Sequence, residues 1–285
     1  MLCSWAGSRV CADGISIVAG TGSIAYGQYD GREARAGGWG ELFSDEGSAY
    51  WIAREGLNLF SRMSDGRAAA GPLQDLFRTE LRLEHDLDLC AAVYGRMKSE
   101  RSPMAQLARL VHQAAIADDR QALAIFEAAA VELAAIVAAA RLRLRVPASV
   151  ALPVSYTGGV FNSDTLVLAP FAQALGRHGP VELRRPRYAP VIGAALYAAR
   201  CRGELPGAQA LERLDALCRV GPLNYAAQRG LYLYPTWFVA TAREPLGVPD
   251  AWMWPRDTQR RKRRTHGRRT PSDLPSSLLP LSGSQ

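Results

Sequence analysis

Cysteine and histidine are scarce and scattered in this sequence. Five cysteines and four histidines occur among 285 residues. The cysteines are odd in number and form no CxxC pair, which excludes a disulfide framework and a cysteine-based metal site and suits a reduced cytoplasm. The histidines show no ligand spacing, so no metal site is predicted from these side chains. The cysteines are Cys3, Cys11, Cys90, Cys201 and Cys218, and the histidines are His85, His112, His178 and His266.

Long apolar runs are also missing. No run reaches the roughly 18 residues that a membrane-spanning helix requires. The first 14 residues carry Arg9 and Asp13, where a signal peptide would need an unbroken apolar core. We therefore expect no membrane anchor and a cytoplasmic location.

Positive charge is confined to one end of the chain. The formal net charge is +7, and the residues from Arg256 onward contribute +6 of it, largely through the run at residues 260–264. A nucleic-acid-binding face would need basic residues spread over the folded body, so nucleic acid is not an expected partner. Beyond Pro222 the chain is aromatic and Pro-rich without clear periodicity, and from Pro255 it is polar, basic and Ser/Pro-rich. Residues 221–285 are predicted to form an irregular, largely disordered tail.

Hydrophobic patterns predict strands first and helices later. Short β-branched runs bounded by glycine predict strands, and apolar residues at helical spacing predict helices. The predicted strands are residues 15–19, 24–26, 32–36, 149–154 and 181–183, and the first three are joined by tight turns. The predicted helices open at residue 45, fill residues 71–146 in several segments, and recur at residues 163–175, 190–200 and 211–218.

This order predicts a fold. Three antiparallel strands, a helix, a strand, a helix, a strand and a helix follow the topology of a ribonuclease-H-like α/β lobe, the unit that actin-like ATPases use twice. The helical stretch at about residues 68–146 is predicted to be an insertion packed beside the sheet. A chain with 48% hydrophobic residues can bury the core that such a lobe needs.

A glycine-rich turn, Gly20-Thr21-Gly22-Ser23, joins the first two predicted strands. Consecutive backbone N–H groups in such a turn can converge on an anion, and the missing side chains let a phosphate approach. The hydroxyls of Thr21 and Ser23 can add donors. The alternative is a hairpin turn with no ligand.

A second glycine-rich segment runs from Gly37 to Ser48. The face of the Trp39 indole suits the apolar face of a sugar ring, and Asp45 can accept hydrogen bonds from neighbouring hydroxyls. The alternative is that Trp39 belongs to the core and that Asp45 caps the following helix.

A Gly-Gly pair, Gly158-Gly159, follows the fourth predicted strand and precedes a helix. Ligands settle at the carboxyl ends of strands in open α/β sheets, and two glycines there can pack against a flat adenine. The alternative is a plain strand-to-helix turn.

Together these segments resemble those of a known family. The segment "GISIVAGTGSIAYGQYDGREARAGGWGELFSDEGSAYWIAREGL" resembles the phosphate- and sugar-binding segments of N-acetylglucosamine kinases and their BadF-type ATPase relatives. The segments "YTGGVFNSDTLVLAPFAQAL" and "PRYAPVIGAALYAAR" are similar to the adenosine-binding end of the same family. The resemblance covers Asp13 to about Leu217, with the motifs in family order.

The resemblance implies an ATP-dependent amino-sugar kinase that forms a sugar 6-phosphate from N-acetylglucosamine or glucosamine. The implied cofactors are ATP and Mg²⁺, with Mg²⁺ arriving with ATP. The implied ATP-binding residues are Thr21, Gly22, Gly158 and Gly159. The implied sugar-binding residues are Ser23, Gly38, Trp39, Gly40 and Asp45.

Two features depart from the family pattern. Family members begin with another lobe, which carries a first phosphate loop, and their catalytic aspartate lies upstream of the first strand of the second lobe. Asp13 is the only carboxylate before that strand here and is predicted to lie in a turn, so no catalytic residue is assigned. We therefore expect residues 13–220 to be the C-terminal lobe alone, residues 1–12 to be an atypical segment, and activity to be low without a homodimer or a partner that supplies the absent lobe.

Two other function classes stay open on the sequence. A BadF-type activator of radical dehydratases would hold an iron–sulfur cluster through closely placed thiolates, and Cys90 has no cysteine nearby in the sequence. A non-catalytic sugar or nucleotide sensor would carry a helix-turn-helix ahead of the lobe, and the sequence shows none there.

Overall fold

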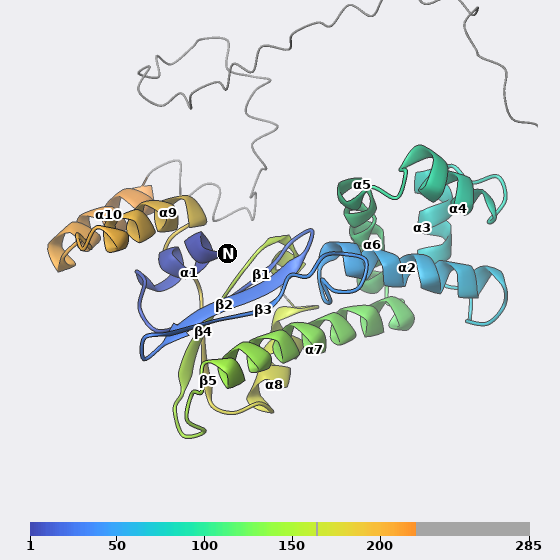
Figure 1. Cartoon of the computed structure of the whole chain (residues 1–285). Helices are drawn as coiled ribbons and strands as arrows, with labels where there is room; N and C mark the ends of the chain where they lie inside the picture. Colours follow the sequence, from blue (N-terminus) through green and yellow to red (C-terminus); the bar gives the residue numbers. More distant parts are fainter. Residues whose placement is uncertain (164, 221–285) are drawn as a thin grey trace, which may run out of the picture. The chain divides into compact units, whose positions relative to one another are not determined.

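A mixed five-stranded sheet forms the centre of the fold, in the order β3-β2-β1-β4-β5 (Figure 1). The computed structural model describes residues 1–163 and 165–220, and the predicted tail at residues 221–285 lies outside the described residues. Strands β1 to β3 are antiparallel, whereas β4 is parallel to β1 and β5 is parallel to β4. The prediction of a mixed α/β fold is confirmed. The strands are β1 Gly14–Ala19, β2 Ser23–Tyr29, β3 Arg32–Gly37, β4 Leu152–Thr157 and β5 Val181–Arg184.

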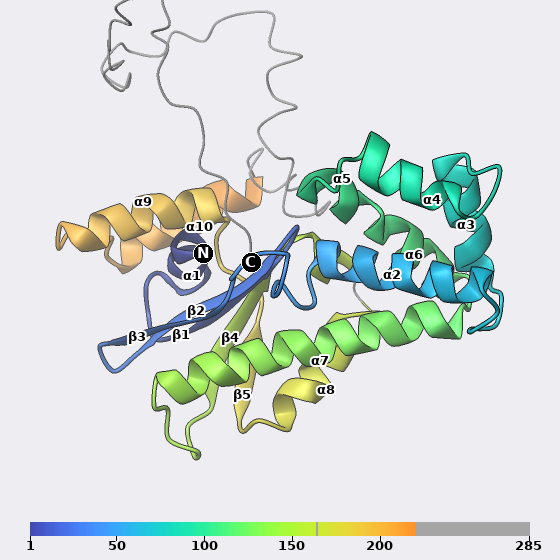
Figure 2. The same ribbon diagram turned by 45° about the vertical axis from the view of Figure 1, so that its right-hand side comes forward.

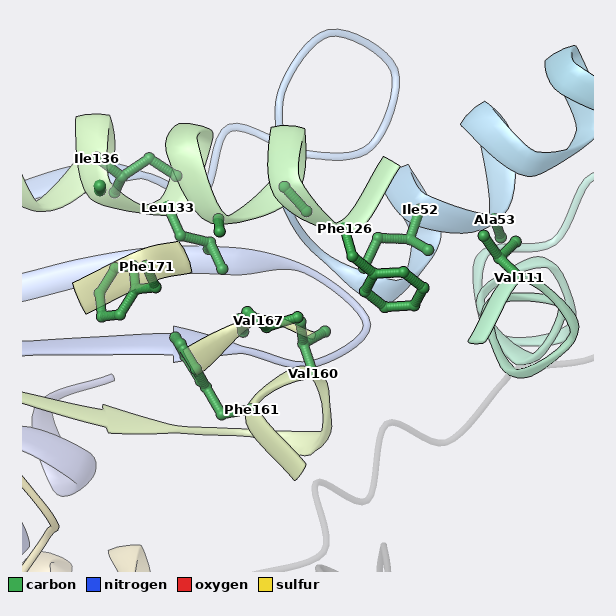
Figure 3. Packing of buried hydrophobic residues seen from close by; sticks show 14 of the residues in the cluster. Ile52, Ala53, Val111, Phe126, Leu133, Ile136, Val160, Phe161, Val167 and Phe171 are labelled. Atoms are coloured by element: carbon green, nitrogen blue, oxygen red, sulfur yellow. The ribbon is translucent and has the colours of Figure 1, made fainter. Parts of the chain in front are cut away.

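One face of the sheet is covered by α7, Arg120–Arg143, and α8, Leu168–Gly176. The large cluster of buried side chains that includes Leu133 of α7 and Phe171 of α8 lies here (Figure 3). Alternate residues of β1, among them Ile17, enter this cluster because side chains of a strand alternate between faces. This central strand is thereby held rigidly in place.

Helix α7 is long and apolar enough to cross a membrane by length and composition. Glu127 and Glu132 break its apolar run, which is why the sequence showed no uninterrupted span. Its buried residues pack on the sheet and on α8, and the core helix of a folded protein meets the same criterion.

The opposite face carries α1, Leu2–Arg9, and α9, Pro190–Cys201, with α10, Ala208–Val220, packed beside them (Figures 1 and 2). Helices α1 and α9 approach closely because glycine lies at the crossing: a Cβ on Gly7 would be 2.9 Å from the carbonyl oxygen of Tyr188 and 3.2 Å from Cα of Gly193. Trp5 is fully buried and packs edge-on against Tyr26 of β2. Residues 1–12 therefore contribute a helix to the packed fold.

The remaining helices extend from one end of the sheet (Figure 2). Helices α3, α5 and α6 pack on α2, and α6 also packs on α7, whereas α7 itself covers the sheet. The stretch expected as one insertion at about residues 68–146 thus divides into an outer group, α3 to α6, and a sheet-covering helix. Helix α2 is Ala49–Ser64, and the outer group consists of α3 Pro72–Leu81, α4 Asp88–Cys90, the π-helix Ala91–Arg96, α5 Arg101–Gln106 and α6 Ala108–Ile116.

Three predicted boundaries are wrong. The helix predicted from Asp45 begins at Ala49, because Asp45 has a φ of 60° that a right-handed helix excludes. Strand β4 begins at Leu152 rather than at Ser149. Helix α8 begins at Leu168 rather than at residue 163, because residues Gly159–Ser163 form a 3₁₀ turn first.

Candidate functional site

Strand register brings the three glycine-rich segments to one end of the sheet (Figure 1). The hairpin at residues 20–22 connects the end of β1 to the start of β2. The bend at residues 37–40 lies beside it, because Ile24 of β2 pairs with Gly37 of β3. The turn at residues 158–159 lies on the other side, because Val18 pairs with Thr157 in the parallel β1–β4 ladder. Segments separated by more than a hundred residues thus share one sheet edge.

The hairpin is tied to the N-terminus of α2. Gly20 donates its backbone N–H to the Gly22 carbonyl at 2.9 Å, and Ala49 at the start of α2 donates to the Gly20 carbonyl at 2.8 Å. The partial positive charge of a helix N-terminus therefore lies next to the turn, where it favours an anion. The Ser23 side chain is buried, and its hydroxyl donates to the Glu46 carbonyl at 2.7 Å.

Asp45 is the buried carboxylate of this sheet edge. Its residue is 2% exposed, and its Oδ1 accepts a hydrogen bond from the backbone N–H of Ser23 at 3.3 Å. Its Oδ2 is paired with the guanidinium of Arg101. The alternative that Asp45 caps α2 is wrong, since Ser48 is the N-cap and its hydroxyl accepts from the Trp51 N–H at 3.2 Å. A non-glycine residue at positive φ costs about 1–3 kcal/mol, so the surrounding contacts hold Asp45 in place.

Gly22 has no space for a side chain. A Cβ there would collide with the Arg101 guanidinium and would lie 2.7 Å from Oδ2 of Asp45. The hairpin backbone is therefore in direct contact with a buried carboxylate and its cationic partner. A ligand bound to the hairpin would meet both groups.

The bend after β3 exposes its aromatic ring. Gly37, Gly38 and Gly40 all have positive φ, and a Cβ on Gly38 would be 2.6 Å from Cδ1 of Ile24. Trp39 is 66% exposed, with the Arg35 guanidinium carbon 5.0 Å from the ring centroid. The alternative that Trp39 belongs to the core is wrong. Its indole lies at the surface, where a ligand can reach it.

The two glycines after β4 have different surroundings. Gly158 has a φ of 105°, and a Cβ there would collide with the backbone of Ala19 in β1. Gly159 has open space within 4 Å of its Cβ position. Gly158 thus brings the β4 turn against the end of β1, where the hairpin at residues 20–22 begins, and Gly159 leaves room beside it.

Arg101 was missed by the sequence analysis. It is the first residue of α5, and besides Asp45 it lies 3.6 Å from Glu41. A separation of 56 residues from Asp45 leaves no signal in the linear sequence. The helical insertion therefore contributes to a sheet edge that the glycine motifs define.

Candidate metal ligands are sparse. Within residues 1–163 and 165–220, no group of three or more His, Cys, Asp or Glu side chains is arranged to hold a metal ion. The carboxylates of Glu41 and Asp45 both face Arg101 instead. This arrangement does not fit a protein-held cation.

The family model for the BadF/BadG/BcrA/BcrD ATPases matches residues 1–198. The chain belongs to the BadF/BadG/BcrA/BcrD ATPase family. The match begins at residue 1, so it includes residues 1–12, which the sequence analysis set apart as atypical. It also includes all three glycine-rich segments and Arg101. The suspected resemblance is therefore confirmed at the level of the family.

Curated relatives of this BadF-family chain are sugar kinases. The N-acetylmuramic acid/N-acetylglucosamine kinase of Clostridium acetobutylicum is 36% identical over 122 residues, which are 42% of this chain and 40% of the relative. The N-acetyl-D-glucosamine kinase of Dictyostelium discoideum is 27% identical over 187 residues, which are 65% of this chain and 59% of the relative. The chain thus spans roughly half the length of the curated relatives that it matches.

Solved structures agree on the fold. A protein of Chromobacterium violaceum provisionally named an N-acetylglucosamine kinase superposes with a TM-score of 0.56 at 27% identity, covering 68% of this chain and 62% of that protein. One of Porphyromonas gingivalis, provisionally named in the same way, superposes with a TM-score of 0.52 at 20% identity, covering 69% and 64%. The second likeness supports the fold alone.

Proposed function

We propose that this chain forms one wall of the active site of an ATP-dependent amino-sugar kinase, which transfers a phosphoryl group to the 6-hydroxyl of N-acetylglucosamine or glucosamine. The observation that carries the proposal is the convergence of the hairpin at residues 20–22, the bend at residues 37–40 and the turn at residues 158–159 on one sheet edge around Asp45. The kinase names of the relatives support the substrate class. The wall corresponds to a ribonuclease-H-like lobe of the actin-like ATPases.

Each segment has a role in this proposal. The backbone N–H groups of Thr21 and Gly22 and the Thr21 hydroxyl, next to the N-terminus of α2, bind the ATP phosphates, because converging donors and a helix dipole stabilise negative charge. Gly158 and Gly159 leave room for the adenosine. Asp45 accepts hydrogen bonds from sugar hydroxyls, and the exposed ring of Trp39 covers one face of the sugar.

The described residues supply binding and positioning rather than proton transfer. Asp13 lies at the start of β1, where it accepts a hydrogen bond from the Asp30 N–H at 3.0 Å, whereas the proposed site lies at the end of the same strand. Asp13 is therefore no candidate for the base. Mg²⁺, when bound, would neutralise charge on ATP, and phosphate oxygens rather than Glu41 or Asp45 would hold it.

Free cysteines support a reducing location for this activity. All five cysteines are unpaired, including the exposed Cys90 and Cys201. Exposed thiols persist in the reduced state in the cytoplasm. We place the proposed kinase there.

The test is binding to the full-length chain. Isothermal titration with a non-hydrolysable ATP analogue should show binding, and Thr21→Val should weaken it about tenfold, because a hydroxyl donor to a charged phosphate is lost. Thr79→Val makes the same chemical change at an exposed position of α3 and should leave the affinity unchanged. Equal affinities for Thr21→Val and Thr79→Val, or no nucleotide binding at all, would contradict the proposed function.

A further inference from the structure

Arg101 is placed between the proposed sugar and phosphate sites. Its guanidinium pairs with Asp45, lies 3.6 Å from Glu41 and touches the hairpin at Gly22. It reaches this position from α5, outside the sheet. The helical insertion thus places a positively charged guanidinium next to the hairpin.

Both oxygens of Asp45 are engaged in this arrangement. Oδ1 accepts from the Ser23 backbone, and Oδ2 is paired with Arg101. Asp45 is 2% exposed, whereas the Arg101 side chain is 39% exposed. Each carboxylate oxygen can accept a second hydrogen bond, but Asp45 is buried in this arrangement, so a sugar hydroxyl reaches Oδ2 only when the groups around it, the guanidinium among them, move aside.

Arg101 has a hydrogen-bond donor that its partners among the described residues leave unsatisfied. A guanidinium carries five N–H donors, and the Nε of Arg101 is buried with no hydrogen-bond partner among the described residues. A buried donor without a partner carries a desolvation cost, so a new acceptor would be favoured. A phosphate group offers two acceptors in the fork geometry that arginine binds best.

We propose that Arg101 is a positioning residue that exchanges partners when nucleotide binds. Without nucleotide it holds Asp45 and Glu41, and with nucleotide it turns to the phosphates at the hairpin and releases Asp45 for the sugar. This inference rests on the proposed function and deepens it. By linkage, nucleotide should then strengthen sugar binding, and sugar should strengthen nucleotide binding by the same factor.

The experiment measures this coupling in the full-length chain. The affinity for N-acetylglucosamine is determined by titration with and without the non-hydrolysable ATP analogue, for wild type, Arg101→Gln and Arg109→Gln. Arg109 is the matched control, because it is a half-exposed arginine of α6 that pairs with Glu80 away from the sheet edge. Thermal melts of all three chains verify that they are folded.

Wild type and Arg109→Gln should bind the sugar about tenfold more tightly when the nucleotide analogue is present. Arg101→Gln should bind the sugar without nucleotide at least as tightly as wild type does, because its Asp45 is already free. The nucleotide analogue should then leave the sugar affinity of this variant unchanged. Inorganic tripolyphosphate should reproduce the wild-type coupling, and adenosine should not.

Three outcomes would overturn the inference. One is a coupling in Arg101→Gln equal to that in wild type. Another is a wild-type chain that binds both ligands but whose sugar affinity does not change when nucleotide is present. This outcome would leave the proposed function standing. The third is coupling produced by adenosine rather than by tripolyphosphate. Failure of every variant to bind either ligand would refute the proposed function itself.

Discussion

The contact between Gly158 and β1 gives the sharpest test of the site's construction. We expect Gly158→Ala to destabilise the fold severely and Gly159→Ala to leave its stability almost unchanged. The two residues are neighbours in one turn and undergo the same chemical change. They differ in backbone conformation and in the space that a methyl group would meet.

The magnitude follows from two costs. Alanine at a φ of 105° is strained by about 1–3 kcal/mol. The new methyl group would also collide with the carbonyl of Ala19 and lie 3.0 Å from its nitrogen, and such overpacking costs about 1–3 kcal/mol. The backbone of Ala19 cannot yield, because it belongs to β1, the central strand. The sum of about 2–6 kcal/mol is a large share of the roughly 5–15 kcal/mol that stabilises a typical domain.

Urea unfolding of the two full-length variants, followed by circular dichroism, measures the difference. Gly159→Ala should stay within about 0.5 kcal/mol of wild type, because its methyl group enters open space. The reasoning would be refuted by a loss of less than about 1 kcal/mol in Gly158→Ala, or by equal losses in both variants.

Two further predictions concern stability away from the site. Leu133→Ala should lower the free energy of unfolding by about 3 kcal/mol, because it opens a cavity under α7. Leu142→Ala on the same helix, where the side chain is 79% exposed, should lower it by less than about 0.5 kcal/mol. The denaturant midpoints of the two variants measure the difference. The Arg78 guanidinium holds the pKa of Asp86 at about 2, below the ordinary 3.8, so Asp86→Asn should lose about 1 kcal/mol at neutral pH after solvent screening. The difference in unfolding free energy between wild type and Asp86→Asn should shrink as the pH falls from about 4 towards 2. Unfolding is measured at several pH values, with Asp75→Asn as control. A difference that stayed constant over this pH range would disprove the reasoning.

Local patterns in the sequence were enough for the sheet. The meander was predicted because its turns are short and glycine-rich, and pairing between consecutive strands needs no long-range information. The start of α2 was misplaced because Asp45 and Ser48 are both ordinary N-cap residues, and only the backbone at Asp45 decides between them. Helix α1 was missed because its burial depends on α9, which lies far along the chain.

In the candidate site, too, some features were predicted from the sequence and others depend on tertiary structure. The glycines at positions 22, 38 and 158 were identified because close backbone approach leaves a residue-type signature. The placement of Trp39 at the surface and the pairing of Asp45 with Arg101 depend on tertiary structure, and nothing in the spacing of those residues indicates it. The sequence therefore indicated the glycines that make close contacts, but not which charged side chains lie beside them.

The backbone turns of the candidate site and the Arg101 side chain differ in their freedom to move. The hairpin and the Gly158 turn are fixed by β1, which is buried on both faces and paired on both edges, so these parts have little freedom to respond to a ligand. Arg101 belongs to a six-residue helix, α5, and its side chain is partly exposed, so it has more freedom to change partners than the hairpin backbone has. In the proposed kinase, affinity for phosphate would come from rigid backbone, and the coupling of ligand binding would come from one side chain of the insertion.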